Sequence, residues 1–170
     1  MNNPVLLLDC MAEALNTLWA MDVTNCPFER TVADHLSHAE AAIRSGSFDP
    51  SDCEPETFGP DGFKTPEALV NWLKENLPPQ DRAGTHGDFC LPNVLLKDGK
   101  VSGFIDCGDT AIGDKWKDIA LCYRSLKHNF DGTFGGKVYP DFNPDLLFDV
   151  LGIEPDWDKI RYWILLDELF

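Results

Sequence analysis

The sequence predicts a mostly α-helical domain that carries one small β-hairpin. Apolar residues recur every three or four positions along much of the chain, which is the spacing of helices that bury one face. One stretch departs from this spacing, because apolar runs at residues 94–96 and 101–105 flank Asp98-Gly99, a pair typical of two-residue hairpin turns. The 170 residues suffice for a single domain with a buried core.

Capping residues and breakers divide the first half of the chain into helices. The first helix is predicted at residues 4–20, and a second begins after the N-cap Thr31 and stops before Gly46. Residues 48–62 are rich in proline, glycine and acids and are predicted to form a loop. A third helix begins after Thr65, with a proline at its first position, and ends before the next pair of prolines.

The second half of the chain is again predicted to be helical after the hairpin. A fourth helix begins after Asp114, residues 132–143 are irregular, a short helix follows, and a last helix capped by Asp156 runs to the end of the sequence. Lys115 and Lys117 are expected on a solvated helix face. Tryptophans at helical apolar spacing are predicted to lie in the core: Trp72, Trp116, Trp157 and Trp163.

The net charge and the cysteine pattern indicate which partners the protein can bind and in which compartment it works. The net charge of −15 should repel nucleic acid and anionic membranes and attract cations. The six cysteines are scattered without a Cys-x-x-Cys pair, which favours free thiols in a reducing compartment over a zinc site or a disulfide framework. No signal sequence or bilayer-length apolar run is visible. We therefore expect a cytoplasmic protein with no nucleic-acid or membrane partner.

Polar residues flank the predicted hairpin in the sequence, before its first strand and after its second strand. A loop with His86 and Asp88 precedes it, Asn93 opens its first strand, and Asp106 follows its second strand. Because a tight hairpin returns its second strand beside the first, Asp88, Asn93 and Asp106 should converge. A carboxylate can orient an attacking hydroxyl, and an amide with a second carboxylate supplies hard oxygen ligands for Mg²⁺.

The pattern therefore predicts phosphoryl transfer, with Asp88 as the catalytic base, Asn93 and Asp106 as Mg²⁺ ligands, and His86 as a structural residue that holds the loop. Protein kinases divide the same roles between an aspartate, a downstream asparagine and an aspartate on the next strand. The alternative interpretation is a hairpin whose turn carboxylates are merely solvated. A His-Gly-Asp motif alone would favour that alternative, but the asparagine five residues on and the Asp-x-Gly motif favour the catalytic interpretation.

A family resemblance rests on three segments, which read HGDFCLPN at residues 86–93, FIDCGDTAIGDKWKDIA at 104–120 and DWDKIRYWILLDELF at 156–170. They resemble the aminoglycoside 3'-phosphotransferases, kinase-fold enzymes of antibiotic resistance, and the likeness runs along nearly the whole chain. The first motif is shared with choline, homoserine and macrolide kinases, whereas the other two narrow the resemblance to the 3' enzymes. It implies a single domain at 1–170, the C-terminal helical lobe of a protein-kinase-like α+β fold.

The resemblance also implies a reaction and a set of site residues. The expected reaction moves the γ-phosphate of ATP or GTP, with Mg²⁺, to the 3'-hydroxyl of a kanamycin-type drug. Asp118 matches a residue that supports the catalytic loop, and Ile105 matches a nucleotide contact. Asp109 stands where the best-known relatives carry arginine. The residues that match the aminoglycoside-binding positions are Glu54, Glu56, Arg124, Asp167, Glu168 and Phe170 with its terminal carboxylate.

The family places its Gly-rich phosphate loop and ATP-binding lysine in an N-terminal lobe, and nothing before the first predicted helix supplies either. We therefore expect this chain to have weak or no kinase activity alone, and to self-associate through the surface that such a lobe would cover. Two other functions remain open: a non-catalytic module that binds aminoglycosides, and a kinase of another small alcohol.

Overall fold

The computed structural model describes residues 4–170, apart from the side chain of Asp52, and is mostly helical. Within this range, none of the helices is both long and apolar enough to cross a membrane. The helices are α1 (Pro4–Trp19), α2 (Val32–Ser45), α3 (Pro66–Glu75), α4 (Lys115–Asp131), α5 (Leu146–Leu151) and α6 (Trp157–Asp167). The strands, which form two antiparallel pairs, are β1 (Arg82–Thr85), β2 (Val94–Lys97), β3 (Lys100–Phe104) and β4 (Ala111–Asp114).

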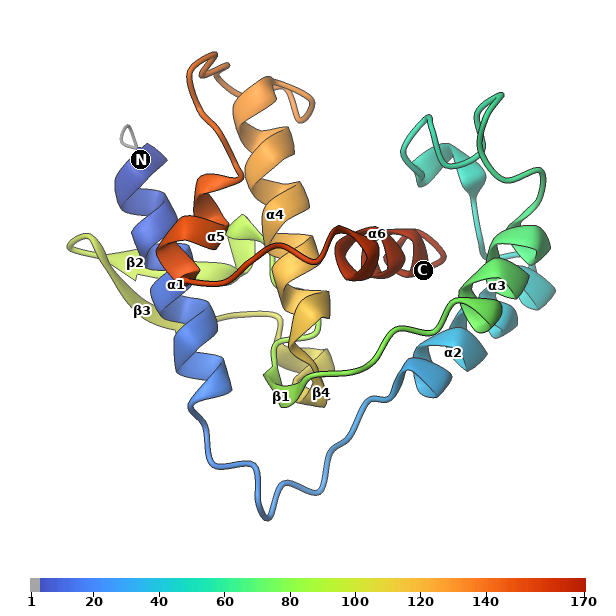
Figure 1. Ribbon diagram of the computed structural model, residues 1–170, viewed down its shortest axis with the longest axis horizontal. Coiled ribbons are helices and arrows are strands. Elements are labelled where there is room, and N and C mark those ends of the chain that lie inside the picture. The colour runs from blue at the N-terminus through green and yellow to red at the C-terminus, as the bar shows by residue number, and fades with distance from the viewer. Residues whose placement is uncertain (1–3) are drawn as a thin grey trace.

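Helices α4 and α6 lie at the centre of the molecule and divide its core into two clusters (Figure 1). One cluster packs α2 and α3 against α4 and α6, and its fully buried members include Leu69 and Leu166. The other packs α1 and α5 against α4 and the β2–β3 hairpin, with Met11 and Leu126 inaccessible to solvent. Since α4 contributes to both clusters, the loops held by its first turn sit on a rigid support.

Local capping explains where the predicted helices begin and end. Thr31 and Asp34 form a reciprocal capping box at the start of α2, in which Asp34 accepts from the Thr31 amide at 2.8 Å. Gly46 ends α2 in the left-handed conformation at φ 73°, and Thr65 caps α3. These boundaries agree with the sequence prediction.

The predicted hairpin is present as β2 and β3, joined by Asp98 and Gly99. Both turn residues have positive φ, 53° and 75°, as a two-residue turn that matches the strand twist requires. Strand β3 ends at Phe104, one residue earlier than predicted.

A second pair of strands was not predicted. Strand β1 pairs antiparallel with β4, and Thr85 lies opposite Ala111. Residues 82–85 show no apolar alternation that would mark a strand, and their partner lies 26 residues away at the Thr85–Ala111 pair. The pairing places the loop after β1 beside the loop before β4, which brings the two motif-bearing segments together.

The structure corrects several side-chain predictions. Trp157 is 47% exposed at the start of α6, so its assignment to the core was wrong, whereas Trp163 on the inner face of that helix is 1% exposed. Lys117 is only 6% exposed because it lines a cavity with His35 of α2 and Asp88, so the prediction of a solvated face was wrong for this residue. Helix α6 ends at Asp167, where the prediction continued it to residue 170.

Candidate active site

The loop after β1 is held by Asp118, which lies in the first turn of α4 and is completely buried. Its carboxylate accepts hydrogen bonds from the backbone N–H groups of His86 at 2.7 Å and Gly87 at 2.9 Å. Burial raises the pKa of Asp118 to about 6, and the two amide donors limit the rise because they favour the ionised form. The loop backbone is therefore fixed to α4, the helix that contributes to both core clusters.

His86 ties this loop to the end of the hairpin. Its ring is buried, and Nδ1 accepts from the backbone N–H of Asp88 at 3.3 Å. The other ring nitrogen, Nε2, lies 2.9 Å from the carbonyl oxygen of Ile105. Since Nδ1 accepts, Nε2 carries the proton and donates to that carbonyl. His86 thus crosslinks the two loops through its two ring nitrogens.

Asn93 orients the carboxylate of Asp88. Its Nδ2 donates to the carbonyl oxygen and to Oδ2 of Asp88, both at 2.9 Å. The carbonyl oxygen of Asn93 accepts from the backbone N–H of Ile105 at 3.0 Å, which places Asp106 one residue beyond the paired positions. Asp88, Asn93 and Asp106 therefore gather at the open end of the hairpin, as the turn predicts.

The donor atoms at this end of the hairpin fit a hard divalent cation. The amide nitrogen of Asn93 is turned toward Asp88, so its side-chain oxygen faces away from Asp88. Asp106 is exposed in a left-handed conformation at φ 58°, and its side chain makes no hydrogen bond or ion pair with residues 4–170. No cluster of three or more His, Cys, Asp or Glu able to hold a metal occurs in that range. Water and phosphate oxygens would therefore complete the coordination of Mg²⁺ here.

The approach of the two loops requires a glycine. Gly87 has φ +89°, and a Cβ added there would lie 2.7 Å from both the Cβ and the carbonyl oxygen of Asp109. Asp109 itself forms an exposed ion pair with Arg30 at 3.5 Å. The glycine of the motif thus serves a close contact between backbones, which the sequence alone does not reveal.

A cavity of about 300 Å³ opens beside Asp88. Predicted site residues in its wall are Asp88, Asp167 and Phe170, so the structure brings the C-terminal residues to the loop after β1. Sequence reasoning missed His35 and Lys117, which line the same cavity. The sequence did contain a signal for Lys117, because it lies seven residues before Arg124, a predicted site residue, and positions seven apart share one face of a helix.

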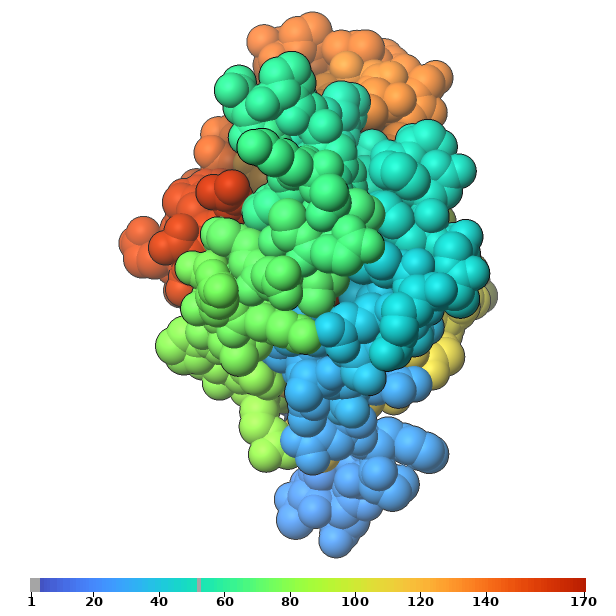
Figure 2. Space-filling model, turned by 90° about the vertical axis from the view of Figure 1, so that its right-hand side faces the viewer, coloured from blue at the N-terminus to red at the C-terminus, as the bar shows by residue number. Residues whose placement is uncertain are grey.

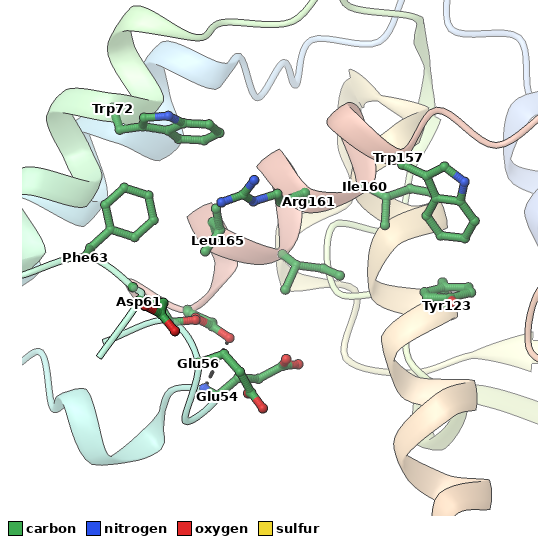
Figure 3. A pocket seen from close by; sticks show the side chains of 14 residues that line it. Glu54, Glu56, Asp61, Phe63, Trp72, Tyr123, Trp157, Ile160, Arg161 and Leu165 are labelled. Carbon is green, nitrogen blue, oxygen red and sulfur yellow. Dashed lines mark hydrogen bonds between the residues drawn. The ribbon is translucent and has the colours of Figure 1, made fainter. Parts of the chain in front are cut away.

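A larger cavity of about 650 Å³ lies along another face of α6 and contains the other predicted acids, Glu54, Glu56 and Glu168. Figure 3 shows Phe63 and Trp72 on one side of this cavity, Tyr123 and Trp157 on the other, and Arg161 between them. The backbone N–H of Glu54 donates to Glu168 Oε1 at 3.2 Å, which joins the loop after α2 to the end of α6.

The predicted aminoglycoside-binding residues therefore fall into two groups. Asp167 faces Asp88 and pairs with Arg124 of α4, whereas its neighbour Glu168 faces the larger cavity. Oε1 of Glu54 also lies 3.5 Å from Nε2 of His128 in α4. Adjacent positions at the end of a helix point in different directions, which explains why residues close in sequence serve separate cavities.

Glu54 and Glu56 also border a third cavity, of about 660 Å³, between their loop and the end of α4. Its opposite wall includes Asp131 and Phe134. Figure 2 shows the loop after α2 lying against the segment that follows α4, at the top of this face. The acidic loop is thus flanked by cavities on both sides.

Comparison with known proteins identifies the family. The sequence model of the phosphotransferase enzyme family matches residues 2–163. The chain belongs to this family. It is 37% identical over 169 residues to an aminoglycoside 3'-phosphotransferase of Enterococcus faecalis, an alignment that covers 99% of this chain and 60% of the relative. An enzyme of the same description from Staphylococcus aureus is 36% identical over the same length and coverage. The chain thus spans about 60% of the length of the curated relatives it matches.

Solved structures of the family share the fold. The aminoglycoside-3'-phosphotransferase of type VIII superposes with a TM-score of 0.79 at 31% identity, covering 97% of this chain and 61% of that one. The aminoglycoside phosphotransferase APH(3'')-Id from Streptomyces rimosus gives a TM-score of 0.81 at 23% identity, covering 97% of this chain and 63% of that one. These likenesses confirm the predicted fold class, the helical lobe of a kinase-like phosphotransferase.

Proposed function

We propose that this chain is the catalytic and acceptor-binding part of an aminoglycoside 3'-phosphotransferase, which transfers the γ-phosphate of ATP or GTP to the 3'-hydroxyl of a kanamycin-type drug. The observation that carries the proposal is the placement of Asp88. Its carboxylate is oriented by the amide of Asn93 and lines a cavity that also contains Asp167. A drug whose hydroxyl enters that cavity can place this hydroxyl beside the Asp88 carboxylate, which is already oriented to accept its proton. The amino groups of the same drug can then lie near the carboxylate of Asp167.

Positioning is the main contribution that these residues make. Phosphoryl transfer depends on alignment and charge stabilisation more than on covalent chemistry by the protein. Asp118 and His86 fix the catalytic loop to α4 and to the hairpin, so Asp88 needs little rearrangement when an acceptor binds. Asp88 then accepts the proton of the attacking hydroxyl or holds that hydroxyl in line.

The donor side of the site lies at the end of the hairpin. Asn93 and Asp106 are the residues that would hold Mg²⁺ there, and Ile105, 46% exposed, offers an apolar surface for a nucleotide base. The bound cation would neutralise charge on the transferred phosphate. Among the residues of this chain, Asn93 links the donor and acceptor sides, since its nitrogen holds Asp88 while its oxygen is left for the metal.

Acidic residues favour a polycationic acceptor. Asp167 lines the cavity beside Asp88, and Glu54, Glu56 and Glu168 line the larger cavity on another face of α6. The net charge of −15 adds a long-range attraction for cations. Arg124 pairs with Asp167 and fixes the position of its carboxylate for an acceptor ammonium group.

The test separates binding from transfer. Calorimetry with kanamycin A should give saturable binding by the wild type that weakens in Glu54→Gln and persists in Asp88→Asn and in the exposed control Asp9→Asn. Intact-mass analysis after incubation with ATP or GTP and Mg²⁺ should then detect phosphorylated drug, at a low level for this chain alone, from the wild type and Asp9→Asn but never from Asp88→Asn.

Absence of kanamycin binding by the wild type would refute the proposal. Binding without product under either nucleotide would instead favour a non-catalytic aminoglycoside-binding module. Product from Asp88→Asn at the wild-type level would exclude Asp88 as the catalytic base.

A further inference from the structure

Two of the predicted drug-binding acids are each paired with a basic side chain of α4. Arg124 pairs with Asp167, at the end of α6. One turn later, Nε2 of His128 lies 3.5 Å from Oε1 of Glu54, in the loop after α2. Because positions four apart share one face of a helix, the same face of α4 meets acids from two distant segments of the chain.

The two pairs differ in how permanent their positive charge is. The guanidinium of Arg124 is charged at every pH at which a protein is folded. A histidine, in contrast, is the side chain whose charge changes between about pH 5 and 8. Glu54 and His128 therefore form an ion pair only when the ring is protonated, and at higher pH Glu54 faces a neutral ring.

The contact between Glu54 and His128 is held on both sides. The ring of His128 meets that of Phe134 edge to face, with centroids 5.2 Å apart, and the backbone N–H of Phe134 donates to the carbonyl oxygen of His128 at 3.3 Å. On the other side, the backbone N–H of Glu54 donates to Glu168 Oε1 at 3.2 Å. The side chains of His128 and Glu54 are only 10% and 30% exposed, so water screens their interaction less than that of a surface pair.

The surrounding charges leave this region attractive to cations. In the wall of the third cavity, the loop after α2 also contributes Glu56, and α4 contributes Asp131 and Lys127. The residues that the segment after α4 adds to this wall are uncharged, and Glu168 at the end of α6 lies near the pair. Carboxylates outnumber cations in the wall whether or not the histidine is protonated. The state of the ring therefore changes how strongly a cation binds, and not whether it is attracted.

We infer that His128 sets the affinity of the protein for a polycationic acceptor, because its protonated ring competes with an ammonium group of the acceptor for Glu54. This inference rests on the proposed function, since it takes Glu54 to bind an amino group of the drug. A carboxylate that already pairs with an imidazolium ion must be shared with the drug or released to it. Partly exposed ion pairs of this kind change an equilibrium by up to about fivefold.

Calorimetry with kanamycin A at about pH 6 and about pH 8 tests the inference. At the lower pH, His128→Gln should bind the drug about two- to fivefold more tightly than the wild type, and at the higher pH the two affinities should converge. His128→Arg keeps a permanent charge, so it should match the wild type at the lower pH and bind more weakly at the higher pH. The amino groups of the drug also titrate, so each variant is compared with the wild type at the same pH.

Two further variants show whether the effect passes through Glu54. Lys127→Gln is the matched control, because it removes a positive charge from the wall of the same cavity, but a charge that is present at both pH values. Its affinity relative to the wild type should be the same at both. In a Glu54→Gln background, His128→Gln should no longer change the affinity, since the ring has lost its partner.

An affinity ratio of His128→Gln to wild type that is equal at both pH values would overturn the inference, as would an undiminished effect of His128→Gln in the Glu54→Gln background. Failure of the proposed function looks different, because then the wild type binds kanamycin A at neither pH and both proposals fall together. Circular dichroism establishes that each variant is folded. If His128→Gln fails to fold, the comparison of His128→Arg with the wild type carries the same test.

Discussion

His35 is buried against the rings of Trp163 and Phe170, so its protonation links pH to stability. Burial, and to a smaller extent the ammonium of Lys117, lowers the pKa of His35 to about 4, whereas an unfolded histidine titrates near 6.5. Between these values the unfolded chain binds more protons than the folded one. The free energy of unfolding should therefore fall as the pH falls through this window, and the contribution is fully present above it.

The size of the effect follows from the two pKa values. Between pH 7 and pH 5, His35 should lower the free energy of unfolding by about 2 kcal/mol. Asp118 acts in the opposite direction, because a folded pKa of about 6 makes the folded state bind more protons between about pH 4 and 6. Between pH 7 and pH 5, protonation of Asp118 should therefore raise the free energy of unfolding by about 1 kcal/mol. The contributions of His35 and Asp118 should thus largely cancel in the wild type over this range.

Single variants expose the two contributions. The free energy of unfolding can be measured at pH 7 and pH 5 by urea denaturation followed by tryptophan fluorescence. On going from pH 7 to pH 5, the free energy of unfolding of His35→Gln should rise by about 2 kcal/mol relative to that of the wild type. In the same comparison, the free energy of unfolding of Asp118→Asn should fall by about 1 kcal/mol relative to that of the wild type. His38→Gln, an exposed neighbour, should follow the wild type. If the wild type and His35→Gln respond equally to pH, the assigned role of His35 is wrong.

Further predictions concern the loop, the core and the metal site. Gly87→Ala should destabilise the protein by about 2 kcal/mol or more, since a Cβ there meets Asp109, and an unchanged melting temperature would contradict this packing. Trp163→Phe should lower the free energy of unfolding by about 2–3 kcal/mol, because it removes the indole N–H that donates to buried Asp114 at 3.0 Å; a loss below about 0.5 kcal/mol in urea denaturation would argue against it. Asp106→Asn should weaken Mn²⁺ binding, measured by paramagnetic broadening of NMR signals, and equal broadening in variant and wild type would exclude Asp106 as a ligand.

The features that could be predicted from sequence depend on neighbouring residues. The capping box of Thr31, the glycine that ends α2 and the turn at Asp98 each form from contacts within a few positions. The hairpin then brings Asn93 and Asp106 to the same end, although a register shift between Leu95 and Leu96, which the turn does not specify, decides which residues lie opposite there. For this reason the gathering of Asp88, Asn93 and Asp106 could be predicted before the geometry was known.

Long-range packing decided the rest. Strand β1 carries no local signal and exists because β4, far along the chain, pairs with it. The burial of Lys117 and the exposure of Trp157 depend on which distant elements pack against α4 and α6, and no periodicity within either helix specifies that. The sequence by itself therefore determined the helices, the hairpin and the candidate site residues that flank it. Only the tertiary structure decided which charges share a cavity, because that depends on contacts between elements that are distant in the chain.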